Sequence, residues 1–429
     1  MLTRLLCCLV LGLGCAASAS GQALSVWVHS GPGPERDAYV ASVRAFNEAQ
    51  ALARDNVRAE LVPLPEADYN EAVNKAARER RLPCVLEFDG PNVASYAAAG
   101  HLVPLERFER MAQIQNAMLA SLVRQGTVDG KLYSVGQYDS GLALWGNRQL
   151  LAQAGVRIPA RVDDGWTLAE FEDALRKLKA AGVASPLDMK FNYGVGEWFT
   201  YGFAPIIQGF GGDLVDRKTL RTAQGTLNSP ASVKAMATLQ GWIRAGYVDP
   251  TPADDKAFVN GRSALSWVGH WVYSDYKKAL GDKLVLMPLP RFGGKTVTGS
   301  GSWNFGIAAS CAQPQAAAKF LEHLMSRAEI LRVTEVNGAV PGTGAAMVYS
   351  RAYGPGGELR LYADQLLAGL ARVRPATAHY PTISRSFALA VSQVAKGADP
   401  QRSLDQAAAA IDRNLADEAA KAAGEKKLP

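Results

Sequence analysis

The sequence predicts an α/β protein with a largely parallel sheet, and two observations lead to that prediction. From Leu24 to Gly100, short apolar runs alternate with amphipathic stretches of helical spacing, a pattern typical of strand-helix units. The chain also has 429 residues. That length exceeds the size at which one hydrophobic core keeps growing, so we expect two lobes.

The elements of the first region follow one another at short intervals. A Gly-Pro-Gly-Pro loop at 31–34 separates the first strand from the first helix, and Gly100 ends the last helix. Ligands bind beyond the carboxyl ends of parallel strands, which here indicates His29 and Ser30 and the segment 89–92. The strands are expected at 24–29, 57–62 and 84–88, and the helices at 35–49, 66–80 and 92–99.

Three extended segments predict crossings between the lobes. Residues 131–145 are extended with a polar interruption at 138–141, and the runs at 298–309 and 337–341 follow later in the chain. Residues 363–422 are expected to be helical apart from a turn at 374–381. The expected division is an N-terminal lobe of 23–137 with 300–340, a C-terminal lobe of 138–299 with 341–429, and hinge crossings near 136–141, 295–301 and 337–343.

A tryptophan-rich turn at 257–271, AFVNGRSALSWVGHW, is the most informative stretch of the chain. Trp267 lies inside a short apolar run, so we interpret it as a core residue. Trp271 stands beside Gly269 and His270 where the run ends, and a large ring on such a turn is not easily buried by its neighbours. We therefore predict that Trp271 lines a binding site.

The N-terminus has the pattern of a secretory signal peptide. Arg4 precedes an apolar run at 5–13 and small residues follow at 16–23, which predicts a signal peptide over 1–21 and a periplasmic protein. The run is too short for a permanent membrane anchor. Cys15 leaves a lipid anchor open as an alternative, although the usual Leu three places before a lipobox cysteine is missing.

Beyond the expected signal, Cys84 and Cys311 are the cysteines of the chain. Each stands at the end of an expected strand, and an exported protein permits disulfides. Adjacent antiparallel strands could join the two, which makes a bridge one hypothesis. Two separate small buried residues are the other.

Composition and spacing argue against several function classes. The net charge is +6 with both signs mixed along the chain, so no nucleic-acid partner is expected. No histidine spacing indicates a zinc site, and no phosphate-binding loop or nucleophile elbow is present, so we expect no metal and no cofactor. Asp89, Asp139 and Glu197 could still converge as the carboxylates of a glycan-acting enzyme.

Six segments stand in order along the chain: LSVWV, LPCVLEFDGPNVASYAAAGHLVPL, GKLYSVGQYDSGLALWGNRQLLAQAGV, AFVNGRSALSWVGHW, GSGSWNFGIAASCAQPQAAAKFLEHLM and NGAVPGT. Together they resemble family 1 extracellular solute-binding proteins of ABC importers, most closely the maltose-binding-protein-like sugar binders. The resemblance covers nearly the whole chain after the signal. It implies the type II periplasmic-binding-protein fold, in which two lobes, each a mostly parallel sheet flanked by helices, hold a ligand between them.

The resemblance also nominates ligand-binding positions. It assigns an acid and a neighbouring ring to Glu197 and Trp198 and the stacking tryptophan to Trp271, while Asp89 could instead cap the helix that follows it. His270 departs from the family pattern, where Pro is common before the tryptophan. The nominated positions are His29, Tyr69, Asp89, Asp139, Ser140, Glu197, Trp198, His270, Trp271, Ser302 and Trp303.

The expected function is that of a monomeric, non-catalytic subunit. It would capture a mono- or oligosaccharide by lobe closure and deliver it to an ABC permease in the inner membrane. The alternatives are an exported glycan-acting enzyme, or the same fold binding a polyamine or a phosphodiester. A phosphate site needs basic groups, which Arg374 or Arg385 could supply.

Overall fold

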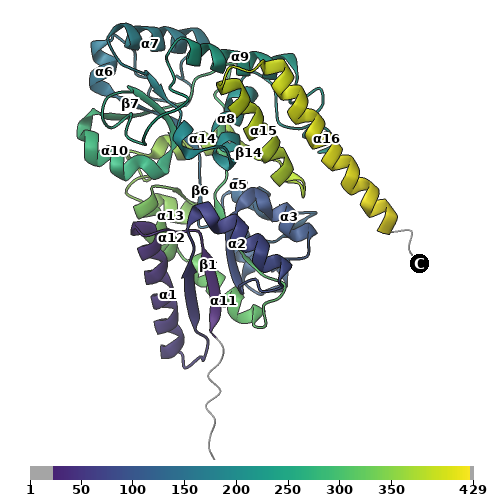
Figure 1. Ribbon diagram of the computed structural model, residues 1–429. Helices are drawn as coiled ribbons and strands as arrows, with labels where there is room; N and C mark the ends of the chain where they lie inside the picture. Colours follow the sequence, from purple (N-terminus) through teal and green to yellow (C-terminus); the bar gives the residue numbers. More distant parts are fainter. Residues whose placement is uncertain (1–22, 426–429) are drawn as a thin grey trace, which may run out of the picture.

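The computed structural model of the protein describes residues 23–425, without the side chains of 66–68 and 418–425. The expected signal peptide at 1–21 and Cys15 lie outside the described residues. The chain forms two bodies, one above the other in Figure 1, which we call the first (lower) and second (upper) lobe. Within residues 23–425, none of the helices combines the length and the apolar composition that crossing a bilayer requires.

The first lobe is formed mainly by the N-terminal part of the chain. Its elements are β1 (Leu24–Val28), α1 (Pro34–Leu52), β2 (Ala59–Pro63), α2 (Glu66–Arg78), β3 (Val85–Asp89), α3 (Val93–Ala98), α4 (Met111–Ala117), α5 (Ala120–Gly126), β4 (Thr127–Val128), β5 (Lys131–Leu132), β12 (Trp303–Ile307), α11 (Pro314–Leu324) and α12 (Arg327–Asn337).

The main sheet of the first lobe has the strand order β12-β3-β1-β2. Strands β1, β2 and β3 run parallel, and β12 runs antiparallel beside β3. One face, with Val26 and Val28, packs against α1, α11 and α12. The other face, with Leu86 and Phe88, packs against α2 and α3. Helices on both faces explain why β3 is buried on both sides.

The second lobe is formed by the middle and the C-terminal part of the chain. Its elements are β7 (Leu142–Asn147), α6 (Arg148–Gln153), α7 (Leu168–Ala180), β8 (Leu187–Asp188), α8 (Glu197–Gly209), α9 (Pro230–Arg244), β9 (Leu265–Gly269), α10 (Tyr273–Leu280), β10 (Leu284–Met287), α14 (Arg360–Leu367), α15 (Tyr380–Ala395) and α16 (Pro400–Glu425).

The sheet of the second lobe corrects one part of the sequence-based prediction. Its order is β10-β7-β9-β8, and the pairs β10·β7 and β7·β9 are antiparallel, with only β8·β9 parallel. A mostly parallel sheet in each lobe is therefore wrong for this lobe. The reason is that β7 starts and β9 ends at the same edge, where Leu142 pairs with Gly269.

The core of the second lobe lies between this sheet and helices α7, α8, α9, α15 and α16. Trp267 is 1% exposed, and its indole Nε1 donates to the carbonyl of Gly202 at 2.9 Å, which confirms its interpretation as a core residue. Helix α7 begins with a capping box of Thr167 and Glu170, which satisfies its first backbone donors. In Figure 1, α16 runs along the outer side of the molecule.

The expected crossings form short ladders where the lobes meet. The elements here are β6 (Tyr138–Asp139), β11 (Thr298–Ser300), β13 (Val340–Pro341), α13 (Gly344–Tyr349) and β14 (Ala371–Val373). Strand β6 pairs antiparallel with β13, and β11 pairs parallel with β14. Strand β14 was not expected, since 363–373 was predicted to be helical; it forms because β11 lies beside it.

Helix α13 is shared between the two lobes. Ala346 packs in the core of the first lobe, while Met347 packs with side chains of the second. The division into 23–137 with 300–340 and 138–299 with 341–429 remains our proposal, and the packing of α13 suggests a third boundary spread over several residues.

A disulfide joins Cys84 to Cys311. Cys84 precedes β3 and Cys311 follows β12, and these strands are antiparallel neighbours. The ladder pairs Val85 with Ile307 near the cysteines and Asp89 with Trp303 at the other end. The bridge therefore closes the end of the sheet that lies away from Asp89.

Candidate functional site

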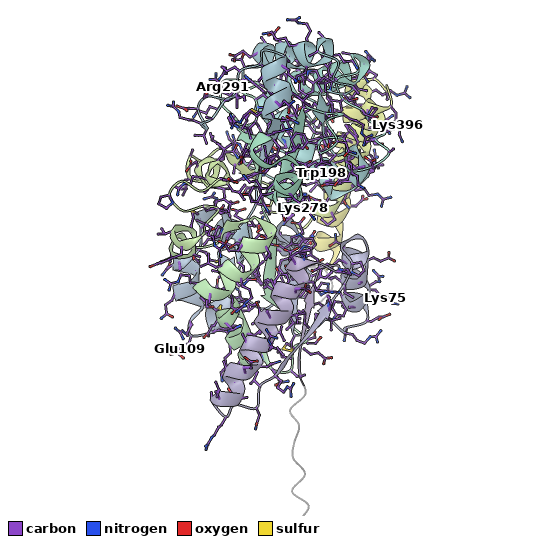
Figure 2. All side chains as sticks on the ribbon, turned by 90° about the vertical axis from the view of Figure 1, so that its left-hand side faces the viewer. Lys75, Glu109, Trp198, Lys278, Arg291 and Lys396 are labelled. Carbon is purple, nitrogen blue, oxygen red and sulfur yellow. A yellow bond between two sulfur atoms is a disulfide. The ribbon has the colours of Figure 1, made fainter. Side chains whose placement is uncertain are left out.

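Four aromatic side chains of the second lobe, which we call the second-lobe rings, gather at the junction of the lobes. They are Tyr193, Trp198, Tyr201 and Trp271. The centroids of Trp198 and Trp271 lie 6.0 Å apart with perpendicular planes, and Tyr193 lies 5.2 Å from Trp198. Trp271 is 38% exposed and Tyr193 37%, so the group presents apolar ring surface to solvent. Figure 2 shows Trp198 at mid-height of the molecule, where the two lobes meet.

Local sequence explains how these rings are placed. Trp198 and Tyr201 stand three residues apart on α8 and so share a face of that helix. Trp271 lies in the 3-10 turn that follows β9, and its Nε1 donates to the hydroxyl of Tyr193 at 3.3 Å. A Cβ on Gly269 would come within 1.9 Å of the Trp271 ring. Glycine at 269 is therefore what allows Trp271 to fold back over the end of its own strand.

The first lobe contributes a second aromatic group, the first-lobe rings, formed by His29, Tyr69 and Trp303. His29 stacks on Trp303 with centroids 3.5 Å apart and planes at 4°, and Tyr69 meets Trp303 edge-on at 5.6 Å. The group stands at the carboxyl ends of β1 and β3, as the strand-end rule predicts for His29. Tyr69 is fully buried, whereas Trp303 is only partly buried.

Buried Glu87 holds the first-lobe rings. Its carboxyl group accepts hydrogen bonds from the backbone N–H of His29 at 2.9 Å, from His29 Nδ1 at 2.7 Å and from the Tyr39 hydroxyl at 2.9 Å. The Tyr69 hydroxyl donates to the backbone carbonyl of Glu87. His29 Nδ1 and the Tyr69 hydroxyl are thus both bonded within the interior of the first lobe.

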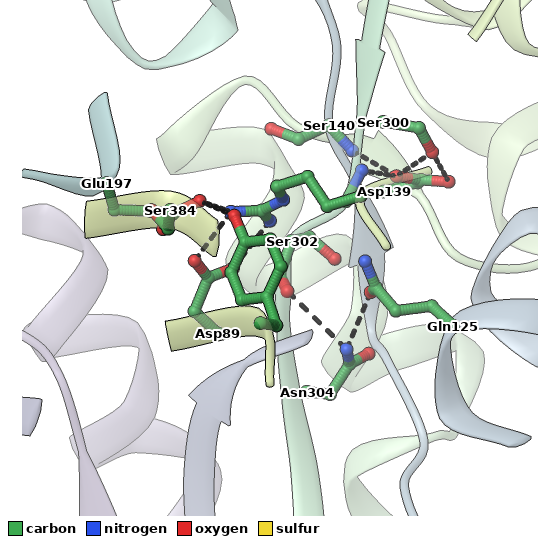
Figure 3. Close-up of polar contacts among 12 residues, drawn as sticks. Asp89, Gln125, Asp139, Ser140, Glu197, Ser300, Ser302, Asn304 and Ser384 are labelled. Carbon is green, nitrogen blue, oxygen red and sulfur yellow. Dashed lines mark hydrogen bonds and ion pairs between the residues drawn. The ribbon is translucent and has the colours of Figure 1, made fainter. Parts of the chain in front are cut away.

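A salt bridge crosses between the lobes, and we call Asp89, Arg374 and Glu197 the inter-lobe bridge. Arg374 Nη1 and Nη2 donate to the two carboxyl oxygens of Asp89, each at 2.7 Å, and Nη1 also donates to Glu197 Oε1 at 2.7 Å. Figure 3 shows Asp89 and Glu197 joined by dashed lines to the same guanidinium group. Arg374 is only 7% exposed. Burial alone would lower the pKa of Arg374. The charges of Asp89 and Glu197 outweigh burial and raise the pKa well above its ordinary value, so the guanidinium stays charged.

Glu197 has further partners within the second lobe. It opens α8, and its carboxyl oxygens accept from the hydroxyl of Ser384 at 2.6 Å and from the hydroxyl of Tyr380, both on α15. The guanidinium of Arg374 lies over the ring of Tyr201, 5.0 Å from its centroid. Second-lobe groups therefore fix Arg374 on more than one side.

Three of the nominated polar residues, Asp139, Ser140 and Ser302, lie at the crossings. Asp139 is fully buried, and its Oδ1 accepts from the backbone N–H of Ser140 at 2.7 Å and of Gly301 at 3.0 Å, which ties β6 to the segment after β11. Burial raises the pKa of Asp139. The Ser302 hydroxyl donates to the backbone carbonyl of Tyr138.

His270 connects the same region to the third crossing. Its Nδ1 donates to the backbone carbonyl of Asn337 at 2.8 Å, and its Nε2 accepts from the hydroxyl of Ser140 at 2.6 Å. Burial lowers the pKa of His270 to about 4, so the ring is neutral and both nitrogens are used. His270 thus hydrogen-bonds to two of the crossings, although its sequence neighbour Trp271 is exposed.

The structure therefore sorts the nominated residues into sets with different surroundings. Trp198 and Trp271 come together, as do His29, Tyr69 and Trp303, and Asp89 and Glu197 meet through Arg374. Asp139, Ser140, His270 and Ser302 are buried. The sequence-based nomination omitted Tyr193, Tyr201, Tyr380, Ser384 and, except as a basic residue for a non-sugar ligand, Arg374.

A signal for one omitted ring was present, since Tyr201 follows Trp198 by one helical turn. No group of three or more His, Cys, Asp or Glu side chains within the described part of the chain is arranged to hold a metal ion. The chemistry of the junction is that of a binding site, with ring faces next to charged hydrogen-bonding groups.

Comparison with known proteins places the chain in a family. The model of the bacterial extracellular solute-binding proteins matches residues 41–347, which is more than half of the chain. The chain belongs to this family of bacterial extracellular solute-binding proteins. Members of the family are binding proteins rather than enzymes, which confirms the expected absence of catalysis and excludes the glycan-acting enzyme.

A curated relative is the maltodextrin-binding protein MdxE of Bacillus subtilis, with 26% identity over 236 residues, 52% of this chain and 53% of the relative. The matched part thus spans about half the length of that relative.

Solved structures show the fold. The GacH receptor of Streptomyces glaucescens superposes with a TM-score of 0.76 at 24% identity, covering 92% of this chain and 98% of the receptor. MalE of Xanthomonas citri superposes with a TM-score of 0.78 at 17% identity, covering 95% of this chain and 100% of MalE. These likenesses confirm the predicted two-lobed type II periplasmic-binding-protein fold.

Proposed function

We propose that this protein is the carbohydrate-binding subunit of an ABC importer. It captures a mono- or oligosaccharide between its lobes and delivers the closed complex to a permease in the inner membrane. The observation that carries the proposal is the exposed indole of Trp271 beside the partly buried indole of Trp198, next to carboxylates contributed by both lobes. Ring faces cover the apolar C–H patches of a sugar, and carboxylates accept hydrogen bonds from its hydroxyls.

Relatives that bind sugars support the choice of ligand class. The GacH receptor is described in complex with acarbose, a protein of Arthrobacter globiformis binds cyclic alpha-maltosyl-1,6-maltose, and a third neighbour holds mannobiose. The relative from Bacillus subtilis is named for maltodextrin. Because these proteins share both the family or fold and a sugar ligand, a carbohydrate is the ligand class we favour for this chain.

The nominated residues have different roles in this proposal. Trp198, Trp271 and Trp303 supply stacking area, and Asp89 and Glu197 receive hydroxyls. His29 and Tyr69 support Trp303 from behind. Asp139, Ser140, His270 and Ser302 act through the hinge, because their polar atoms serve the crossings rather than open surface.

The remaining expectations belong to the same proposal. We propose that a signal peptide at 1–21 exports the chain to the periplasm, in accord with an extracellular solute-binding family. We propose a monomer that works with the permease and does not bind nucleic acid, because the net charge of +6 is spread along the sequence.

A thermal-shift panel tests the ligand class. The panel contains glucose, maltose, maltotetraose, mannobiose and tagatose, with spermidine and a glycerophosphodiester as non-sugar probes. A ligand that binds only the folded state stabilises it by about 2.7 kcal/mol at a hundredfold excess over Kd. We expect a sugar of the panel to raise the melting temperature. A shift with spermidine or the phosphodiester and with no sugar would overturn the assignment.

A further inference from the structure

We propose that Arg374 is a positioning residue that joins the lobes before a ligand arrives: its guanidinium, held on the second lobe, binds Asp89 of the first lobe and shifts the ligand-free protein toward the closed form. This inference rests on the proposed function, because it describes the regulation of the same site.

Arg374 is fixed from the side of the second lobe. It directly follows β14, its Nη1 donates to Glu197 at 2.7 Å, and Glu197 is itself held by Ser384 at 2.6 Å. The ring of Tyr201 lies beneath the guanidinium at 5.0 Å and adds a cation–π contact. The charged group is therefore oriented toward the first lobe by neighbours that all belong to the second.

Asp89 receives this group from the first lobe. It ends β3, and both of its oxygens accept from Arg374 at 2.7 Å in a two-pronged arrangement. Paired charged hydrogen bonds of this geometry are strong and directional. Asp89 is 13% exposed and Arg374 7%, so water weakens the pair little.

Desolvation is the cost that opposes such a pair. For Arg374 most of that cost does not fall on closure, because Glu197 and Tyr201 already cover the guanidinium from within the second lobe. When the lobes close, Arg374 gains the contact with Asp89, and the negative charge of Asp89 compensates the positive charge of the guanidinium. The inter-lobe bridge therefore favours the closed form over the open one.

The backbone leaves room for this arrangement at Gly301. Its φ of +126° is one that only glycine adopts readily, and a Cβ there would lie 2.7 Å from Arg374 Nη2. Gly301 also donates its N–H to Asp139 at 3.0 Å. The second crossing is thus shaped so that the side chain of Arg374 can pass it and reach Asp89.

The inter-lobe bridge leaves the stacking surface free. Arg374 covers Tyr201, whereas Trp271 remains 38% exposed. A sugar can then lie on Trp271 and Trp198 while the bridge stays formed. Since apparent affinity scales with the fraction of molecules in the binding-competent form, a bridge that raises the closed fraction strengthens binding beyond the direct contacts of Asp89 and Glu197 with the sugar.

Small-angle X-ray scattering of the ligand-free exported protein tests the inference. We expect Arg374→Gln to increase the radius of gyration, with Arg374→Lys between it and the wild type because Lys keeps the charge but loses the two-pronged geometry. The matched control is Arg157→Gln. Arg157 also pairs with two acids, Asp164 and Glu170, but within one lobe and at the surface, so its radius of gyration should stay that of the wild type.

A double-mutant cycle separates the inter-lobe bridge from a general loss of packing. Asp89→Asn should also open the ligand-free protein, and the double variant Asp89→Asn with Arg374→Gln should open it no further than the more open single variant. Additive effects, or a wild-type radius of gyration in Arg374→Gln and Asp89→Asn alike, would overturn the inference. If both Arg374 variants fail to fold, Asp89→Asn alone decides it.

Calorimetric titration with maltose distinguishes this inference from the proposed function. We expect Arg374→Gln to bind maltose roughly tenfold more weakly than the wild type, through a smaller closed fraction. If scattering shows that Arg374→Gln is more open but titration shows unchanged maltose affinity, the claim that the bridge persists in the sugar-bound form would be contradicted. If none of the panel sugars binds the wild type, the proposed function is contradicted. The scattering result would still show whether the inter-lobe bridge closes the ligand-free protein.

Discussion

The two aromatic groups at the junction are built differently. In the first-lobe rings, His29 stacks in parallel on Trp303, Tyr69 meets both edge-on, and a fully buried carboxyl group, that of Glu87, holds His29. Among the second-lobe rings, Trp198 meets Trp271 and Tyr193 edge to face, and Trp271 and Tyr193 are each more than a third exposed. The first group is held within its own lobe, while two of the four rings in the second group are exposed to solvent.

This difference gives the two groups different roles: the first-lobe rings keep one side of the site rigid, and the second-lobe rings supply contact area for a ligand. A polar network that is fully paired in the interior orders the chain around it, so the first-lobe rings offer one fixed edge. Exposed ring surface gains most from being covered by a ligand, so the second-lobe rings should contribute more to affinity. Substitutions in the first group should therefore lower stability, and substitutions in the second should lower binding.

The largest effect is expected for Glu87→Ala. It leaves the His29 ring and the Tyr39 hydroxyl buried without their acceptor, so we expect the free energy of unfolding to fall by about 4 kcal/mol. Urea denaturation measures this change. The exposed Glu60→Ala on β2 is the control, with an expected change within about 0.5 kcal/mol. Equal stabilities of the two variants would break the comparison at the first-lobe rings.

The next effect concerns pH and His270. Folding lowers the pKa of His270 from 6.5 to about 4 by burial, so below pH 6.5 the unfolded chain binds a proton that the folded chain does not. Stability should therefore fall between pH 6.5 and 4, by an amount on the order of 3 kcal/mol, with no contribution from this group above that window.

Unfolding of the wild type and of His270→Gln across this pH range measures the contribution. Burial raises the pKa of Asp139, which acts in the opposite direction in both proteins, so the difference between the two isolates His270. Parallel pH profiles of the wild type and His270→Gln would show that burial does not keep His270 neutral in the folded protein.

A smaller effect, confined to binding, is expected for Trp271→Ala. Loss of an exposed stacking face should weaken sugar binding by about 2 kcal/mol with little change in melting temperature, since the ring is 38% exposed. Calorimetric titration with the sugar identified by the panel measures the loss. The matched Trp303→Ala should lower melting temperature as well, because Trp303 packs on His29 and Tyr69. Unchanged affinity in Trp271→Ala would count against the second-lobe rings as the contact surface.

The smallest effect is expected for Tyr193→Phe. It removes only the acceptor of the Trp271 Nε1 hydrogen bond, so affinity should fall by about 0.5 kcal/mol. Tyr273→Phe, which removes a hydroxyl bonded to Glu358 elsewhere in the second lobe, should leave affinity unchanged. A larger loss in the control than in Tyr193→Phe would show that Trp271 needs no positioning by Tyr193.

The sequence predicted much of the fold because its signals are local. Apolar runs, helical spacing and glycine or proline breaks placed the first three strands and the first three helices within a few residues of their observed bounds. The antiparallel pairing of β7 with β9 was not predicted, because strand direction depends on where the chain re-enters the sheet.

The candidate site was predicted in part for the same reason. Trp271 follows a strand and stands beside Gly269, and both facts are visible in the sequence. His270 differs from it by one position, yet its surroundings depend on Ser140 and Asn337, which lie on two separate crossings.

The sequence alone determined that this chain has alternating strands and helices, a core tryptophan at 267 and an exposed one at 271, since these follow from periodicity over a few residues. Only the tertiary structure decided that Arg374 meets Asp89, 285 residues away, and that Glu197 joins them. Such contacts depend on how the strands are ordered and how the lobes face each other, and no local pattern encodes the distance between residues so far apart.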